Sequence, residues 1–143
     1  IETDGLPCAC GNRGCWEKYA SVSALIAQTE AAAEANKDSI LANVIKDDCV
    51  VDGKTVFKAM NMGCPVAQKV FDKYIDYLAI GVRNIINIFR PGLVVISGGI
   101  SEAGDRLLKP LIQKVGSDTP IKISRLQNDA GIIGAATLGK NAK

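Results

Sequence analysis

Three of the five cysteines of the chain fall within eight residues, in the glycine-spaced run CACGNRGCWE at residues 8–17. So much Cys and Gly does not suit the interior of a helix or strand, so residues 1–16 are predicted to form a loop. Zinc needs about four tetrahedral ligands, and Cys8, Cys10 and Cys15 would supply three. Three ordinary reduced thiols are the less favoured alternative, because a glycine-spaced cluster rarely serves packing. The spacing therefore predicts a zinc loop at about residues 4–16, with its fourth ligand from elsewhere.

The other readings of three clustered cysteines fit less well. A disulfide would leave one thiol over, and iron–sulfur clusters usually take four cysteines. Five cysteines is an odd number, and Cys49 and Cys64 stand in apolar surroundings far from the cluster. This usage favours a reducing, cytoplasmic location over a disulfide scaffold.

Composition and charge exclude several classes of protein. The chain has 143 residues, 48% of them hydrophobic and 22% charged, which predicts one globular domain with its own core. The net charge of +2 is dispersed, which argues against a nucleic-acid or anionic-membrane partner. No apolar run reaches the roughly 20 residues of a membrane span, and nothing resembles a signal peptide. The chain begins with Ile rather than Met, so we expect it to be part of a longer protein.

Helical patterns dominate the first two thirds of the chain. Ser21 and Ser23 are candidate caps for an alanine-rich helix at 22–36, and Thr55 for a helix that ends at Gly63. Residues 37–53 have a weaker pattern, typical of a loop or a short irregular helix. The strongest signal lies between Pro65 and Pro91, where apolar residues recur every three or four positions over 65–90. This segment is predicted to be the central packing helix.

Strand patterns appear in the last third. Residues 93–97, LVVIS, form an unbroken apolar run typical of a strand covered on both faces in a parallel or mixed sheet. A helix is predicted at 104–116, a second strand at 121–126 and a helix of small residues at 130–140. This order of helices and strands predicts an α/β fold.

The cysteine run resembles the signature of the ROK family of repressors, open reading frames and sugar kinases, C-x-C-G-x-x-G-C-x-E. The resemblance implies the C-terminal lobe of an actin/hexokinase-like (ribonuclease H-like) ATPase fold over residues 1–143, with the N-terminal lobe absent. The family's structural zinc takes three cysteines and a histidine from an E-x-G-H motif about ten residues earlier. This chain has no histidine, so that ligand would precede Ile1. The matching residues are Cys8, Cys10, Gly11, Gly14, Cys15 and Glu17.

Glu17 is the candidate substrate-binding residue. From spacing alone, a glutamate that opens a helix is more often a partner of the helix dipole than a ligand. The resemblance implies instead that Glu17 accepts hydrogen bonds from hexose hydroxyls, which a carboxylate does well.

Glycine pairs mark the candidate nucleotide site. Gly98 and Gly99 follow the strand at 93–97, where a backbone can approach a ligand closely and open a helix N-terminus to an anion. Two glycines after a strand are more often only a tight turn, but the resemblance implies that they line an adenosine pocket, with Ala130 and Gly131 nearby. For Gly134 and Ala135, close packing of helix on sheet is an equally good explanation.

The resemblance implies an ATP-dependent hexose kinase of the glucokinase type that uses Mg²⁺ and pairs as a homodimer. Its catalytic aspartate and first phosphate loops would lie upstream, so no catalytic residue is assigned here, and the 143 residues alone are expected to be inactive. The alternative is the effector-binding domain of a sugar-responsive repressor, which would add an N-terminal helix-turn-helix. A zinc-stapled interaction domain without ligand is the third reading.

Overall fold

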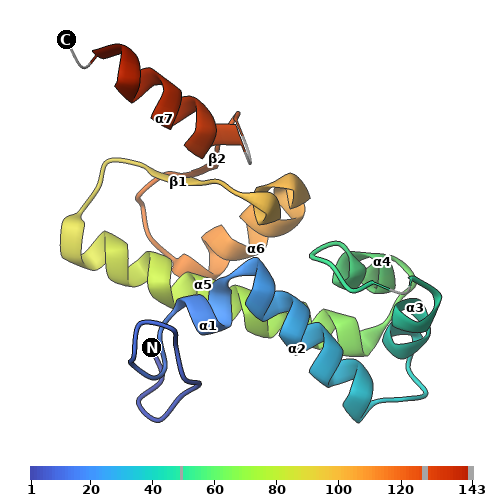
Figure 1. Ribbon diagram of the computed structural model, residues 1–143. Coiled ribbons are helices and arrows are strands. Elements are labelled where there is room, and N and C mark those ends of the chain that lie inside the picture. Colours follow the sequence, from blue (N-terminus) through green and yellow to red (C-terminus); the bar gives the residue numbers. More distant parts are fainter. Residues whose placement is uncertain (49, 127–128, 142–143) are drawn as a thin grey trace. The chain divides into compact units, whose positions relative to one another are not determined.

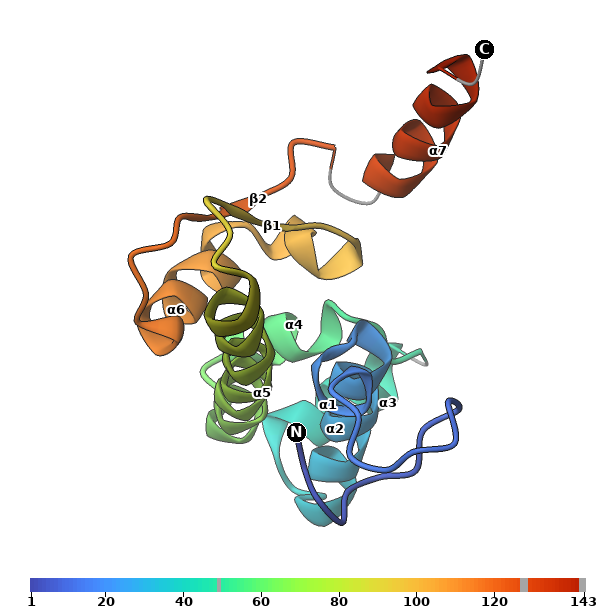
Figure 2. The same ribbon diagram turned by 90° about the vertical axis from the view of Figure 1, so that its left-hand side faces the viewer.

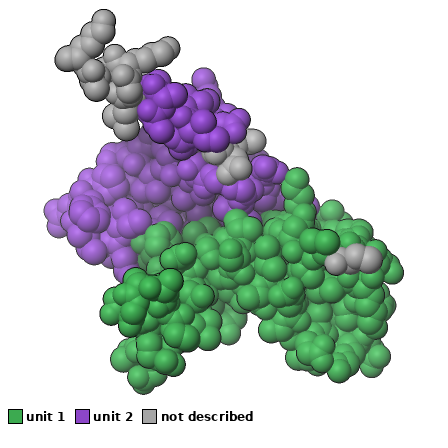
Figure 3. All heavy atoms as spheres, in the orientation of Figure 1, with its two compact units in different colours: residues 1–81 green, residues 82–143 purple. Residues whose placement is uncertain are grey.

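The computed structural model describes residues 1–48, 50–126 and 129–141. The chain divides into two compact units, residues 1–81 and 82–143, although its length alone predicts a single domain (Figure 3). Cys49 lies outside the described residues. Among the described helices, none combines the length and the apolar character that crossing a membrane requires.

The first unit is helical and begins with the predicted loop (Figure 1). The helix predicted at 22–36 is confirmed as α2 (Val22–Ala35), and the Ser21 hydroxyl caps it by accepting the N–H of Ala24 at 3.1 Å. The segment 37–53, where the helical pattern is weak, contains a regular helix, α3 (Ile40–Asp48). The helices of this unit are α1 (Glu17–Ala20), α2 (Val22–Ala35), α3 (Ile40–Asp48), α4 (Thr55–Asn61) and the first part of α5 (Pro65–Phe89).

Helix α5 supplies the centre of this unit's core, as its periodicity predicts. Tyr74 and Ile75 are fully buried, and Leu25, Leu41 and Val56 from the other helices are equally inaccessible. The Tyr74 hydroxyl donates to the carbonyl of Ala20 at 3.0 Å, so its polar atom is satisfied. Burial of this side chain raises the pKa of Tyr74 to about 12. The phenol therefore stays a neutral hydrogen-bond donor at any physiological pH.

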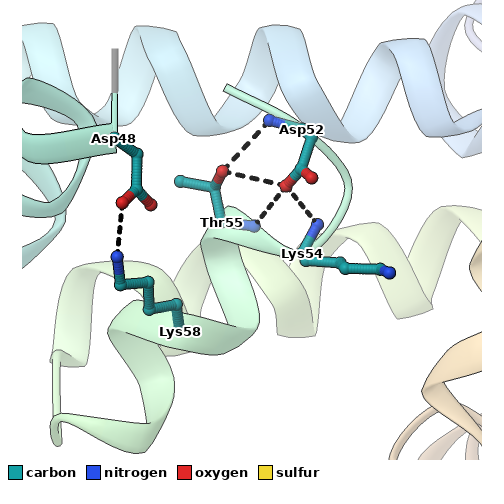
Figure 4. Close-up of polar contacts among 5 residues, drawn as sticks. All are labelled: Asp48, Asp52, Lys54, Thr55 and Lys58. Carbon is teal, nitrogen blue, oxygen red and sulfur yellow. Dashed lines mark hydrogen bonds and ion pairs between the residues drawn. The ribbon is translucent and has the colours of Figure 1, made fainter. Parts of the chain in front are cut away.

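The start of α4 corrects one prediction. The sequence predicts Thr55 as the cap, but Thr55 is the first helical residue, and the carboxylate of Asp52 caps the helix (Figure 4). Asp52 Oδ1 accepts the backbone N–H groups of Lys54 at 2.8 Å and Thr55 at 3.0 Å, and the Thr55 hydroxyl accepts the N–H of Asp52 in return. A carboxylate three residues before Thr55 reaches two free N–H groups where a hydroxyl reaches one. The N–H of Lys54 is the main cause that lowers the pKa of Asp52.

Asp52→Ala is expected to lower the free energy of unfolding by about 1 kcal/mol at pH 7, because α4 loses its cap. Since the folded pKa of Asp52 is depressed, its stabilisation is present above the ordinary carboxyl pKa and is lost as pH falls through the folded value. The difference between wild type and variant should therefore shrink below about pH 4. Urea unfolding at pH 7 and pH 3 measures this, with exposed Asp47→Ala as the control. An equal loss at both pH values would contradict it.

The second unit has an α/β arrangement around a parallel sheet, which confirms the predicted class. Val94 lies opposite Ile121 and Ile96 opposite Ile123, so the two strands pair over three residues each. Figures 1 and 2 both show these strands side by side. After the end of α5, the elements are β1 (Val94–Ile96), the 3₁₀-helix η1 (Gly99–Ala103), α6 (Asp105–Val115), β2 (Ile121–Ile123) and α7 (Ala130–Asn141).

Helix α6 provides the core of this unit. Its Leu107, Leu111 and Val115 are buried. The guanidinium of Arg83 on α5 donates to the carbonyl of Val115 at 3.1 Å and to that of Lys114. A cation at the carbonyl end of a helix is favoured by the helix dipole, so Arg83 fastens α5 to the end of α6.

Strand β1 is less covered than predicted. Val95 is 52% exposed and Leu93 is 46% exposed, whereas Val94 and Ile96 are half-buried. One face of β1 is thus open among the described residues. A run of apolar β-branched residues predicts a strand well, but it does not distinguish one covered face from two.

Candidate functional site

The three cysteines of the loop come together as predicted. The sulfur atoms of Cys8, Cys10 and Cys15 all lie within 4.8 Å of one another. The sulfurs of Cys10 and Cys15 are 3.4 Å apart. Zinc–sulfur bonds of about 2.3 Å in a tetrahedron place two sulfurs about 3.8 Å apart. The donor atoms and their spacing therefore fit a zinc ion.

Two glycines shape this loop, as the sequence predicts. Gly11 has φ +87° and Gly14 has φ +69°, a region that residues with a side chain rarely adopt. At Gly14 a Cβ would also lie 1.6 Å from the carbonyl oxygen of Glu2. The N–H of Cys8 donates to the carbonyl of Asn12 at 2.9 Å and closes the turn. The backbone thus folds back on itself and brings sulfurs from both sides of the turn together.

The thiols of the loop differ in acidity. The backbone N–H of Asn12, then the thiols of Cys15 and Cys8, lower the pKa of Cys10 to about 7. Hydrogen bonds to Cys10 and Cys8 favour the protonated form of Cys15 and raise its pKa to about 11. Without metal, Cys10 is therefore partly ionised near neutral pH, and metal binding would release the proton of Cys15.

The described part of the chain places no fourth Cys, His, Asp or Glu ligand beside these sulfurs. Among the described residues, the cluster contains only the three cysteines. The side-chain amide of Asn12 lies 3.6 Å from the sulfur of Cys10, but it is a hydrogen-bond donor there. The chain has no histidine. The described residues provide three of the four positions that a tetrahedral zinc site needs.

Glu17 is the first residue of α1 and is exposed. It follows Cys15 by two residues, so the carboxylate lies close to the loop along the chain. A groove of about 880 Å³ lies in the same unit, but Glu17 is not part of its lining. That groove is lined in part by loop residues 2–6 and by Tyr19, Gln28 and Tyr77, none of which was a predicted ligand-binding residue.

The predicted glycine pair forms a turn, with one correction. Gly98 has φ +91°, and η1 follows it directly, whereas α6 begins only at Asp105 after Gly104. The pair therefore opens a short 3₁₀-helix and not a longer helix. Ser101 holds this turn, since its hydroxyl donates to the carbonyl of Gly98 at 2.6 Å.

Of the two glycines, Gly99 is the one whose lack of a side chain the local structure does not explain. Its φ is not in the left-handed region, and a Cβ there would meet no atom within 4 Å. Neither backbone torsion nor packing among the described residues requires glycine at this position. A bare backbone beside open space suits the close approach of a ligand.

Ala130 and Gly131 begin α7. A Cβ at Gly131 or Gly134 would meet no atom within 4 Å, so close packing on a sheet does not explain these glycines within the described part of the chain. Among the described residues, no hydrogen bond joins Ala130 or Gly131 to the turn at Gly98.

Comparison with known proteins decides the family. The model of the ROK family matches residues 1–142. The chain belongs to the ROK family. A glucokinase of Halalkalibacterium halodurans is 35% identical over 98% of this chain and 45% of its own length. The xylose repressor of Bacillus subtilis is 31% identical over 99% of this chain and 32% of its own length.

Solved structures of ROK proteins have the same fold. A ROK family glucokinase from Streptomyces griseus, in complex with glucose and AMPPNP, aligns with a TM-score of 0.84 and 28% identity over 96% of this chain and 48% of its own. A ROK family transcriptional regulator, a homologue of the Escherichia coli MLC protein, aligns with a TM-score of 0.74 and 28% identity over 98% and 36%. This chain spans about half the length of the curated glucokinases that it matches.

Proposed function

We propose that the chain is the C-terminal lobe, with an actin/hexokinase-like fold, of an ATP-dependent hexose kinase of the glucokinase type. The observation that carries the proposal is the run from Cys8 to Glu17, which folds into a three-sulfur cluster followed at once by a helix that begins with a carboxylate. The likeness to a glucokinase with bound glucose and AMPPNP supports the same reading.

Each site residue has a proposed role that suits the chemistry of its side chain or backbone. Cys8, Cys10 and Cys15 would hold zinc, which supplies structural cross-linking of the loop when bound. Glu17 would accept hydrogen bonds from hexose hydroxyls, and the turn at Gly98 and Gly99, with Ala130 and Gly131, would face ATP. Mg²⁺ would neutralise phosphate charge. No catalytic residue is proposed among the 143, and the general base would belong to the other lobe.

In the full-length enzyme, Glu17→Ala is expected to weaken hexose use by roughly 1.5–3 kcal/mol, because a charged hydrogen-bond acceptor is lost. This corresponds to a rise of about 10- to 150-fold in hexose KM/kcat. The KM for ATP should change little. A coupled kinase assay with hexose and ATP varied separately measures both.

Glu30→Ala is the matched control, since Glu30 is also an exposed glutamate on a helix of the same unit. It should leave both KM values unchanged. An unaltered hexose KM in Glu17→Ala would make Glu17 a helix-dipole partner and nothing more.

The second candidate is the effector-binding part of a sugar-responsive repressor, which the similarity to the xylose repressor favours. Hexose-dependent ATP consumption by the full-length protein distinguishes the two. A helix-turn-helix upstream, with hexose binding but no ATP consumption, would establish the repressor.

We further propose that the full-length protein is a homodimer in the cytoplasm. The odd number of five cysteines does not suit a disulfide scaffold, which supports a reducing compartment. Apolar side chains remain open on α5, where Ile88 is 71% exposed and Phe89 is 72% exposed. Such surface favours a partner subunit.

A further inference from the structure

Trp16 is the one tryptophan of the chain, and it stands between Cys15 and Glu17. Its indole Nε1–H donates to the backbone carbonyl of Tyr77, on α5, at 2.9 Å. These two residues are 61 positions apart in the sequence, and both belong to the first unit. The side chain between the candidate zinc ligand and the candidate sugar ligand is therefore anchored to the central helix.

Gly81 makes this contact possible. A Cβ at Gly81 would lie 1.9 Å from Cε2 and 2.3 Å from Cδ2 of the Trp16 ring, so the indole rests directly on the bare helix backbone. Side chains on a helix lean over the preceding turn, so a side chain at 81 would also cover the carbonyl of Tyr77. One glycine thus provides both the space for the ring and access to its acceptor.

Further contacts fasten α1 to the same stretch of α5. The rings of Tyr19 and Tyr77 pack with their centroids 4.8 Å apart. Tyr74 bonds to the carbonyl of Ala20, the last residue of α1. A helix of four residues cannot hold its own shape in water, so these contacts decide where α1 points.

We propose that Trp16 is a positioning residue that aims the Glu17 carboxylate at the hexose by docking on Gly81 and the carbonyl of Tyr77. The inference rests on the proposed function, in which Glu17 binds the sugar. The side chain of Glu17 is exposed, so surrounding side chains do little to orient it. The direction in which its carboxylate points therefore depends on the backbone, which Trp16 fixes. Trp16 would act on the sugar only through Glu17.

Glucose titrations of the full-length protein by calorimetry test this. Trp16→Phe keeps a ring but loses the N–H, and it should raise the Kd for glucose about three- to tenfold. Trp16→Leu should raise it further. The Kd for AMPPNP should not change in either variant, because the nucleotide would contact other residues.

A double-mutant cycle separates positioning from general stability. In a Glu17→Ala background, Trp16→Phe should have no additional effect on the Kd for glucose, since the group that it aims is gone. Phe57→Leu, a buried aromatic on α4, is the control for lost stability and should leave the Kd unchanged.

Three outcomes would count against the inference, and each is distinct. If Glu17→Ala weakens glucose binding but Trp16→Phe does not, Trp16 has no positioning role. If the two effects add in the double variant, Trp16 acts by another route. If Glu17→Ala itself leaves the Kd unchanged, the proposed role of Glu17 is wrong, and the positioning role falls with it.

Discussion

Replacing any one of Cys8, Cys10 and Cys15 with serine is expected to remove zinc from the full-length protein and to lower its melting temperature at the same time. Zinc content should fall from about one per chain toward zero, because a site that loses one of its thiolates loses most of its affinity. Binding of a structural zinc contributes directly to folding, with apparent free energies of about 10–16 kcal/mol in small zinc peptides. Elemental analysis and thermal unfolding measure the two effects.

Cys64→Ser is the matched control for this prediction. Cys64 is buried directly before α5 and lies outside the sulfur cluster. Its replacement should cost stability through a buried hydroxyl but should leave the zinc content unchanged. A full-length protein that is metal-free after gentle purification and still folded would overturn the zinc proposal.

Gly81→Ala is expected to lower the free energy of unfolding by about 3 kcal/mol. Alanine gains about 1 kcal/mol over glycine inside a helix. Against this, the new methyl would overlap three atoms of the rigid Trp16 ring, within 1.9–2.3 Å. To accommodate the methyl, the ring and the helix must shift, which costs up to about 3 kcal/mol, and this shift breaks the hydrogen bond of the indole to Tyr77, which is worth about 1 kcal/mol more.

Urea unfolding of the two variants Gly81→Ala and Gly92→Ala measures this effect. A Cβ at Gly92 would meet no atom within 4 Å, so this control should stay within about 0.5 kcal/mol of wild type. If Gly81→Ala instead stabilises the protein, as helix propensity alone predicts, the indole does not rest on α5 as described.

Features that depend on neighbouring residues could be predicted from the sequence. The cysteine cluster needs only eight residues, and Gly11 and Gly14 permit the turn that brings the sulfurs together. The helices at α2 and α5 follow from a capping serine, flanking prolines and a 3.6-residue apolar period, all of which act within one or two turns. The place of Gly99 beside a nucleotide stays a prediction.

Local pattern was less decisive where two hydrogen-bond acceptors can cap the same helix, or where one or two faces of a strand can be covered. Asp52 and Thr55 are both good caps, and only the path of the chain before α4 determines that the carboxylate reaches the free N–H groups. The apolar run at β1 does not distinguish one covered face from two, and Val95 is exposed. The 3₁₀-helix after Gly98 likewise depends on the Ser101 hydroxyl bond, which a strand-and-turn pattern does not indicate.

By itself, then, the sequence determined the cysteine loop, the long helix and the α/β order of elements, because sterics, caps and periodicity act over a few residues. Tertiary structure alone decided that Trp16 meets Gly81. The residues around Gly81 do not distinguish it from any other glycine inside a helix, because the side chain that requires glycine there is a ring 65 positions away. Residues that pack together in a core fit by shape and are often far apart in the sequence. A single sequence shows both residues of such a pair but not that they are in contact.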